Sequence, residues 1–198
     1  YPIPTLEELK RAIESMIEDS SINSVVVSGG EPTIHPDFIN FIKYLCNKEL
    51  KITILSNSER FSDKKFADEF LTAVPIDQIE LITTIHSHLE EEHEAVNGAQ
   101  GSFKRTIDGL LRIQSGGIHT TVKHCITKAN YRDLCKFYEF IDGIFPQETD
   151  IQMCSIDYCG LTEENKYDYM VVFPELYSSF EEMFDLYLKK MNTGNIRH

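Results

Sequence analysis

Two glycines and a carboxylate follow directly after a short apolar run, in the stretch VVVSGGEP at positions 25–32. Glycines at a strand end let the backbone turn sharply and let a ligand approach its N–H and C=O groups. A neighbouring carboxylate can accept a hydrogen bond from an ammonium group and pair with its charge, and Pro32 fixes the direction of the exit. The turn therefore favours a small ligand with a free amino group. The alternative is a tight turn in which Glu31 is merely solvated.

Small polar residues also end the other apolar runs of the chain. These ends read Ser56-Asn57-Ser58, His86-Ser87, Lys128-Ala129-Asn130 and Tyr158-Cys159-Gly160. In parallel sheets, ligands bind at the carboxyl ends of the strands. The contrast between apolar strands and polar ends therefore predicts a binding site at that edge.

The elements that must position these residues alternate strictly. We expect helices that begin near Thr5, Pro36, Asp63, Ser102, Asn130 and Pro174, and strands over 23–28, 51–55, 79–85, 118–126 and 150–156, with a long acidic loop over 89–101. Alternation with near-continuous apolar strands indicates a parallel sheet flanked by helices. The fold prediction is α/β: a partial (β/α) TIM-like barrel, or an open doubly wound sheet, with about five parallel strands and a C-terminal helical segment.

The stretch GGEPT after an apolar strand, followed by His-Pro and an amphipathic helix, resembles the radical S-adenosylmethionine (SAM) superfamily. A second stretch, positions 83–130, resembles the superfamily's fourth strand, the loop with Gly-Ser-Phe, the next helix and the fifth strand ending in Asn. The likeness spans roughly Ser24 to Gly160 and favours the partial barrel. It implies a core domain over 1–160 and a helical extension over 161–198.

The resemblance assigns roles in cofactor binding to eight residues. Gly29, Gly30 and Glu31 match the turn that binds the methionine amino group of SAM, and Ser56 and Asn57 match the third-strand position that faces it. Ser87 matches a fourth-strand position near ribose or carboxylate. The fifth-strand region near adenine and ribose is matched by Ile126 and Asn130.

The cluster-binding motif of the superfamily is absent from these 198 residues. Members hold a [4Fe–4S] cluster with three thiolates, usually in Cys-x3-Cys-x2-Cys. We expect the strand and loop that carry it to lie upstream of Tyr1, since the chain begins without Met and resembles the middle of a longer protein. The alternative is a natural loss of the cluster. Either way, three missing thiolates leave the cluster with too few ligands, so the chain alone is not expected to cleave SAM.

The resemblance implies that the full-length parent cleaves SAM reductively to a 5′-deoxyadenosyl radical, which abstracts hydrogen from a substrate. Peptide, protein and small-molecule substrates all stay open. Two competing hypotheses remain: a non-catalytic nucleoside-binding or regulatory domain, and an unrelated doubly wound enzyme with a fortuitous Gly-Gly-Glu turn.

The net charge of −13 disfavours binding to nucleic acid, and no apolar run has the length of a membrane span. The odd count of five cysteines predicts reduced thiols in the cytoplasm. We expect ordinary packing for Cys125, Cys154 and Cys159, no metal site in this chain, and solvated loop positions for His86, His88 and His93. An unpaired strand over 25–27 would invite self-association.

Overall fold

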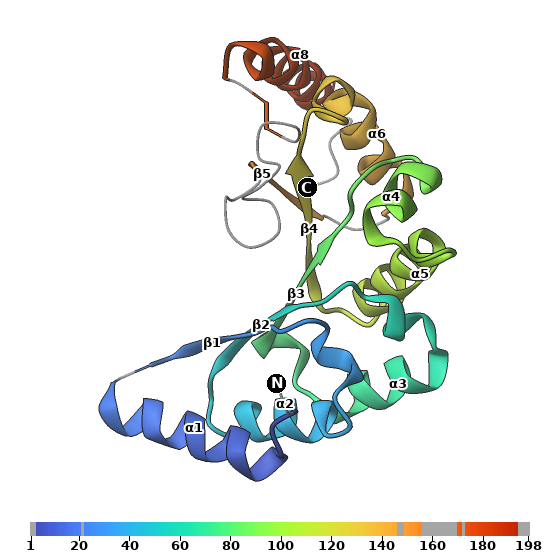
Figure 1. Ribbon diagram of the computed structural model, residues 1–198. Coiled ribbons are helices and arrows are strands. Elements are labelled where there is room, and N and C mark those ends of the chain that lie inside the picture. Colours follow the sequence, from blue (N-terminus) through green and yellow to red (C-terminus); the bar gives the residue numbers. More distant parts are fainter. Residues whose placement is uncertain (1–2, 21, 146–148, 156–169, 172, 194–198) are drawn as a thin grey trace. The chain divides into compact units, whose positions relative to one another are not determined.

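The computed structural model describes residues 3–20, 22–145, 149–155, 170–171 and 173–193 (Figure 1). Helices and strands alternate along most of the chain. The helices are α1 (Leu6–Asp19), α2 (Phe38–Cys46), α3 (Lys64–Ala73), α4 (Glu90–Asn97), α5 (Ser102–Ser115), α6 (Leu134–Ile144) and α8 (Phe173–Asn192). The strands are β1 (Ser24–Val27), β2 (Lys51–Leu55), β3 (Ile79–Thr84), β4 (His119–Ile126) and β5 (Asp150–Ser155), and the short 3-10 turns are η1 (Pro32–Ile34), η2 (Glu59–Ser62), η3 (Ile76–Gln78) and η4 (Tyr131–Asp133).

The five strands form one parallel sheet in the order β1-β2-β3-β4-β5. Val25 of β1 pairs with Ile52 of β2, and Ile52 pairs with Ile79 of β3, so these three residues lie side by side across the sheet. Parallel neighbours need crossover connections, and helices supply them. The predicted α/β class with about five parallel strands is confirmed.

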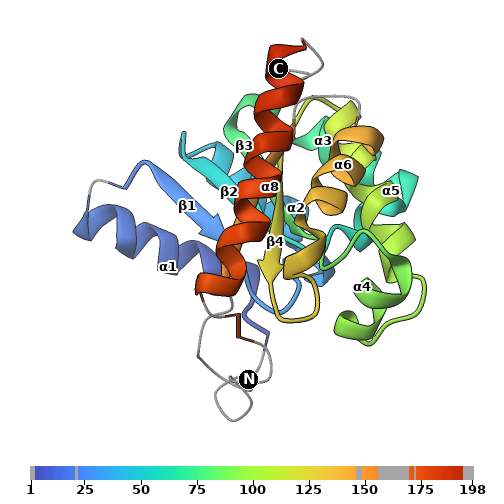
Figure 2. The same ribbon diagram turned by 90° about the horizontal axis from the view of Figure 1, so that it is seen from above.

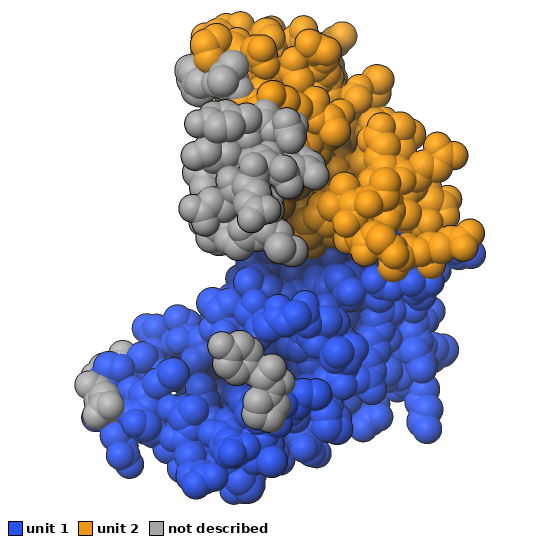
Figure 3. All heavy atoms as spheres, viewed as in Figure 1, with its two compact units in different colours: residues 1–83, 101–121 blue, residues 84–100, 122–198 orange. Residues whose placement is uncertain are grey.

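The chain divides into two compact units (Figure 3). The first comprises residues 1–83 and 101–121, and the second comprises residues 84–100 and 122–198. The predicted boundary between a core domain and a C-terminal extension, at 160/161, lies outside the described residues and stays a prediction. Among the described residues, no helix is both long and apolar enough to cross a membrane.

In the first unit α2 packs against β2, whose Ile52 and Ile54 are buried. The core of this unit includes a cluster of phenylalanine rings in which Phe61 lies 5.1 Å from Phe70 and Phe38 lies 5.7 Å from Phe70, centroid to centroid. Such offset and tilted ring pairs are favourable beyond the apolar area that they bury. This cluster joins α2, η2 and α3.

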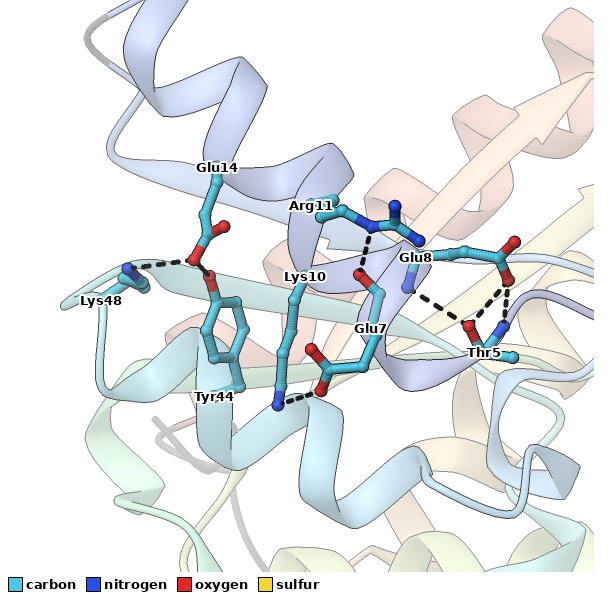
Figure 4. A network of polar contacts seen from close by, with 8 residues as sticks. All are labelled: Thr5, Glu7, Glu8, Lys10, Arg11, Glu14, Tyr44 and Lys48. Atoms are coloured by element: carbon cyan, nitrogen blue, oxygen red, sulfur yellow. Dashed lines mark hydrogen bonds and ion pairs between the residues drawn. The ribbon is translucent and has the colours of Figure 1, made fainter.

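Helix α1 begins next to Thr5, as predicted, with a capping box formed by Thr5 and Glu8. Glu8 N–H donates to Thr5 Oγ1 over 3.3 Å, and Thr5 N–H donates to Glu8 Oε2 over 2.8 Å (Figure 4). The hydrogen bonds with Thr5 hold the pKa of the Glu8 carboxyl below its usual value. On the other side of the helix, Tyr44 of α2 donates to Glu14 over 2.9 Å, and burial with the Glu14 contact raises the pKa of Tyr44 to about 12. The bond between Tyr44 and Glu14 links α1 to α2.

The second unit has its own apolar cluster around Ile126, Tyr131 and Leu134. Leu176, Phe180 and Met183 of α8 pack against it, and α8 lies beside α6, where Lys190 forms an ion pair with Asp142 over 2.6 Å (Figure 2). The apolar and aromatic side chains along α8 include both packed and exposed members. Phe180 is packed, whereas four other members are exposed: Tyr177, Phe184, Tyr187 and Met191.

One local prediction was wrong, because the expected acidic loop contains helix α4, which ends at Gly98 with a left-handed φ of 65°. Helix α5 begins at Ser102 as predicted; Ser102 is buried, and Gly101 takes the N-cap position. Asn130 precedes η4 and makes no side-chain cap hydrogen bond, because its amide bonds elsewhere.

Candidate functional site

The diglycine turn between β1 and η1 presents a bare backbone. A Cβ added to Gly29 or to Gly30 would meet no atom within 4 Å, and neither residue has the positive φ that favours glycine. Neither conformation nor crowding therefore requires glycine at these positions. The remaining physical use of a missing side chain is close approach of another molecule to the backbone.

The carboxylate of Glu31 is already bonded within the protein. Oε1 accepts from Thr33 N–H over 3.0 Å, from Thr33 Oγ1 over 2.6 Å and from Ser56 Oγ over 2.8 Å. Oε2 accepts from Asn57 N–H over 2.7 Å. A carboxylate has about four acceptor sites, so these bonds use most of its capacity. Glu31 thereby joins the end of β1 to the end of β2.

Side-chain hydrogen bonds fix the conformation of the turn after β2. Ser58 N–H donates to Ser56 Oγ over 3.0 Å, and Ser58 takes a left-handed φ of 62°. Its hydroxyl lies 2.5 Å from Thr83 Oγ1, and both residues are fully buried. A non-glycine residue with positive φ is uncommon and requires support from its surroundings, which these bonds provide.

Helix α5 closes against this turn. Thr106 Oγ1 donates to Asn57 C=O over 3.0 Å, and Arg105 forms an ion pair with Glu59 over 2.7 Å. Gly109 lets the backbones meet, because a Cβ at this position would lie 2.0 Å from Ser58 O. The first unit therefore brings together five predicted site residues, namely Gly29, Gly30, Glu31, Ser56 and Asn57, and adds three that the sequence analysis missed: Thr33, Thr106 and Gly109.

The other three predicted site residues lie in the second unit. Ser87 is buried; its hydroxyl donates to Glu92 over 2.6 Å and accepts from Leu89 N–H over 3.1 Å. Ile126 is 4% exposed and packs into the apolar cluster, so its side chain faces protein. The Ser87 side chain therefore bonds to the start of α4, and the Ile126 side chain packs in the core of the second unit.

The Asn130 side chain joins the ends of two strands. Its Nδ2 donates to Cys125 C=O over 2.9 Å and to His86 C=O over 3.1 Å, and its Oδ1 accepts from Thr127 N–H over 2.7 Å. Asn130 is 8% exposed. Because His86 directly precedes Ser87, the second unit brings Ser87, Asn130 and the end of β4 near one another.

The histidines differ from expectation. His93 was expected in solvent but is fully buried, with Nδ1 accepting from His86 N–H over 3.2 Å. Burial and the neighbouring His86 lower the pKa of His93 to about 4. Burial also lowers the pKa of His86 and of His124. These histidines are neutral structural groups at neutral pH.

The residues present do not fit a [4Fe–4S] cluster. Among the described residues, no group of three His, Cys, Asp or Glu side chains could hold a metal ion. Four cysteines are described, and Cys159 lies outside the described residues. Since the sequence also lacks Cys-x3-Cys-x2-Cys, the three thiolates of such a cluster are not supplied by this part of the chain.

A cavity of about 490 Å³ lies in the first unit beside β1. Side chains of α1, α2 and β1 line it, and the diglycine turn forms part of its border. Apolar lining residues include Leu9, Ile13, Met16, Val25, Phe41 and Leu45, and Ser28, Glu31 and His35 are polar members at its border. This lining suits an apolar chain segment and not a charged cofactor.

Comparison with known proteins gives consistent results. The family model of the radical SAM superfamily matches residues 1–141. A curated relative, the antilisterial bacteriocin subtilosin biosynthesis protein AlbA of Bacillus subtilis (strain 168), is 21% identical over 132 residues, which cover 64% of this chain and 27% of AlbA.

Two solved structures share the fold. Native anSMEcpe with bound AdoMet has a TM-score of 0.74 and 19% identity, covering 98% of this chain and 54% of that chain. Streptococcus suis SuiB bound to precursor peptide SuiA has a TM-score of 0.74 and 17% identity, covering 96% of this chain and 41% of that chain. These likenesses confirm the predicted fold, the partial barrel shared by these neighbours.

Proposed function

The chain belongs to the radical SAM superfamily, and from this premise we propose that it binds S-adenosylmethionine at the diglycine turn. In the full-length parent, together with a [4Fe–4S] cluster, the bound cofactor would supply a 5′-deoxyadenosyl radical for hydrogen abstraction from a substrate. The contribution of this chain is to bind and orient the cofactor.

The observation that carries the proposal is the open backbone at Gly29 and Gly30. Both glycines adopt a conformation that alanine can share, and both face open space. We propose that the amino end of the methionine moiety lies against this backbone. Glu31 then acts mainly by holding the turn, because its carboxylate is bonded to Thr33, Ser56 and Asn57.

Ser87, Ile126 and Asn130 are assigned a role in SAM binding by resemblance alone. The Ile126 side chain is buried and the Asn130 amide is bonded to strand ends. We therefore propose that these residues contribute through the shape and backbone of the strand ends that they hold.

The cluster belongs to another part of the parent in this proposal, since the residues described here do not fit it. The chain alone is then expected to bind SAM without cleaving it. A sample reconstituted with iron and sulfide that releases 5′-deoxyadenosine would contradict this. The competing regulatory-domain hypothesis predicts that the full-length parent is equally inactive.

A peptide is the substrate class that we favour for the parent. The support is that SuiB has been solved with a precursor peptide and that anSMEcpe has been solved with AdoMet and a peptide. Assays of the parent should therefore begin with peptide substrates.

We propose further that the free edge of β1 pairs with another strand. Among the strands that the structure describes, β1 ends the sheet, and Val26 is 62% exposed. An extended segment beside β1 would bury apolar side chains in the 490 Å³ cavity. Such a segment could come from elsewhere in the parent, and in its absence we expect two copies of this chain to associate.

Binding is tested by titration calorimetry with SAM on wild type, Gly29→Ala, Gly30→Ala and Gly143→Ala. The structure leaves open space for the new methyl group at all three sites, so the variants should fold alike. We expect saturable binding for wild type and Gly143→Ala and at least a tenfold loss for the other two. No binding by wild type at millimolar SAM, or equal affinity in all four proteins, would refute the proposal.

A further inference from the structure

Two cysteine thiols meet on neighbouring strands of the second unit. Cys125 Sγ of β4 lies 3.7 Å from Cys154 Sγ of β5, and both residues are half-buried. We propose that this pair is a dithiol that peroxides oxidise to a reversible disulfide between the two strands. The sequence analysis assigned both residues to ordinary packing.

The geometry of the sheet permits the bridge. Cys125 and Cys154 belong to strands that are adjacent in the sheet order. Neighbouring strands lie about 4.8 Å apart, and disulfides join Cα atoms about 4.4–6.8 Å apart. Closing the sulfur–sulfur distance from contact to a bond therefore requires side-chain rotation and no break in the sheet.

Both thiols project from the same face of the strands. Met153, next to Cys154, packs against the cluster of Ile126, and His124, next to Cys125, stacks on Phe137 of α6 at 3.8 Å. Because successive side chains of a strand point to opposite faces, the two thiols lie on the face turned away from α6. Helix α6 therefore does not cover them.

The thiols form a short hydrogen-bonded chain. Cys154 Sγ donates to His124 C=O over 3.7 Å, which leaves Cys125 as the donor in the contact between the two sulfurs. Burial and the neighbouring Cys154 raise the pKa of Cys125 to about 11. Little Cys125 thiolate is therefore present at neutral pH. We assign the first attack on the peroxide to the Cys154 thiolate, because Cys154 lies on β5, the end strand of the described sheet.

The reaction balances in two steps. The Cys154 thiolate attacks the O–O bond of hydrogen peroxide, forming a sulfenic acid and releasing hydroxide, which takes up the thiol's proton to give water. The Cys125 sulfur then displaces the sulfenic oxygen as a second water and loses its own proton. Two thiols and one peroxide thus give one disulfide and two waters.

The bridge would hold β5 to the strand end that Asn130 organises. Cys125 C=O accepts a hydrogen bond from Asn130 Nδ2, so Cys125 contacts both the Asn130 side chain and the neighbouring strand β5. Since β5 is the last strand in the sheet order, it has a neighbour on one side only among the described strands. Oxidation should therefore make it less frequent for β5 to separate from β4.

The test treats the whole 198-residue chain with hydrogen peroxide, alkylates the remaining thiols and maps peptides with and without dithiothreitol. We expect a peptide cross-linked between Cys125 and Cys154 that reduction releases. Amide exchange of β5 should slow by about tenfold in the bridged form. In Cys125→Ser, a sulfenic acid at Cys154 should be trapped by dimedone, whereas Cys154→Ser should show little trapping at Cys125.

Cys135→Ser is the matched control, because Cys135 is also half-buried and lies on α6 away from the pair. It should form the cross-link as wild type does. A cross-link between Cys154 and Cys159 instead, overoxidation of Cys154 without any cross-link, or equal trapping at Cys125 and Cys154 would overturn the proposal.

Discussion

Replacing Glu31 by glutamine tests whether its carboxylate holds the ends of β1 and β2 together. In the glutamine variant one oxygen can still accept from Thr33 and Ser56, which are both buried. The other position becomes an NH2 group that faces Asn57 N–H, so two donors oppose each other where a 2.7 Å bond existed. The substitution therefore loses one bond and weakens the others.

The expected cost follows from these bonds. A hydrogen bond to a charged group contributes about 1.5–3 kcal/mol, and one between neutral groups about 0.5–1.5 kcal/mol. Losing the Asn57 bond and neutralising the remaining three should lower the free energy of unfolding by about 3–5 kcal/mol. Glu31→Ala should cost at least as much, because it also leaves buried donors of Thr33 and Ser56 without an acceptor.

Urea unfolding followed by circular dichroism measures the free energy, and hydrogen exchange with mass spectrometry localises the change. Peptides covering 51–60 should exchange faster in Glu31→Gln, while peptides from α6 should be unchanged. Glu69→Gln is the control, because Glu69 is exposed on α3 and should change stability by less than about 0.5 kcal/mol. Unchanged stability and exchange in Glu31→Gln would show that the carboxylate does not hold the turn.

Three other perturbations have defined outcomes. Gly109→Ala places a methyl group 2.0 Å from Ser58 O, so urea unfolding should show a loss of about 3 kcal/mol; stability equal to wild type would contradict the close approach of α5. Because the pKa of His93 falls from 6.5 to about 4 on folding, the unfolded chain takes up the proton first, and stability should decrease as pH falls from 6.5 to 4, by up to about 3 kcal/mol. His93→Gln should lack that part of the slope, and an identical slope would exclude His93 as the cause. Val26→Lys should shift the chain toward monomer in light scattering at high concentration, since a charged edge opposes strand pairing; a monomeric wild type would refute self-association.

Features set by neighbouring residues were predictable from the sequence. The capping box of Thr5 and Glu8 fixed the start of α1, and β-branched residues with polar flanks gave β2 its correct limits, Lys51–Leu55. Helix α4 was missed because its eight residues contain few apolar side chains. Its acidic first turn and Gly98 were nevertheless helix signals.

The site was predictable only in part, because its bonds join distant positions. Resemblance selected Glu31, Ser56 and Asn57, and the structure bonds them to one another across 25 or more residues. Whether the carboxylate would face a ligand or the protein depends on that long-range pairing, which no local pattern encodes. Ile126 illustrates the same limit, since the resemblance assigned it to the region near adenine and ribose, whereas its side chain packs in the core.

Transplanting this turn into another scaffold would require more than the five residues GGEPT. The Glu31 carboxylate accepts from Thr33 within this segment, but its other donors, Ser56 and Asn57, belong to a second loop. That loop in turn meets the backbone of α5 at Gly109. A chimera that exchanges the diglycine segment alone should misfold locally, whereas one that exchanges 28–34, 55–59 and 102–115 as a set should keep its shape. Natural variation in any one of these three segments is accordingly expected to be matched by changes in the other two.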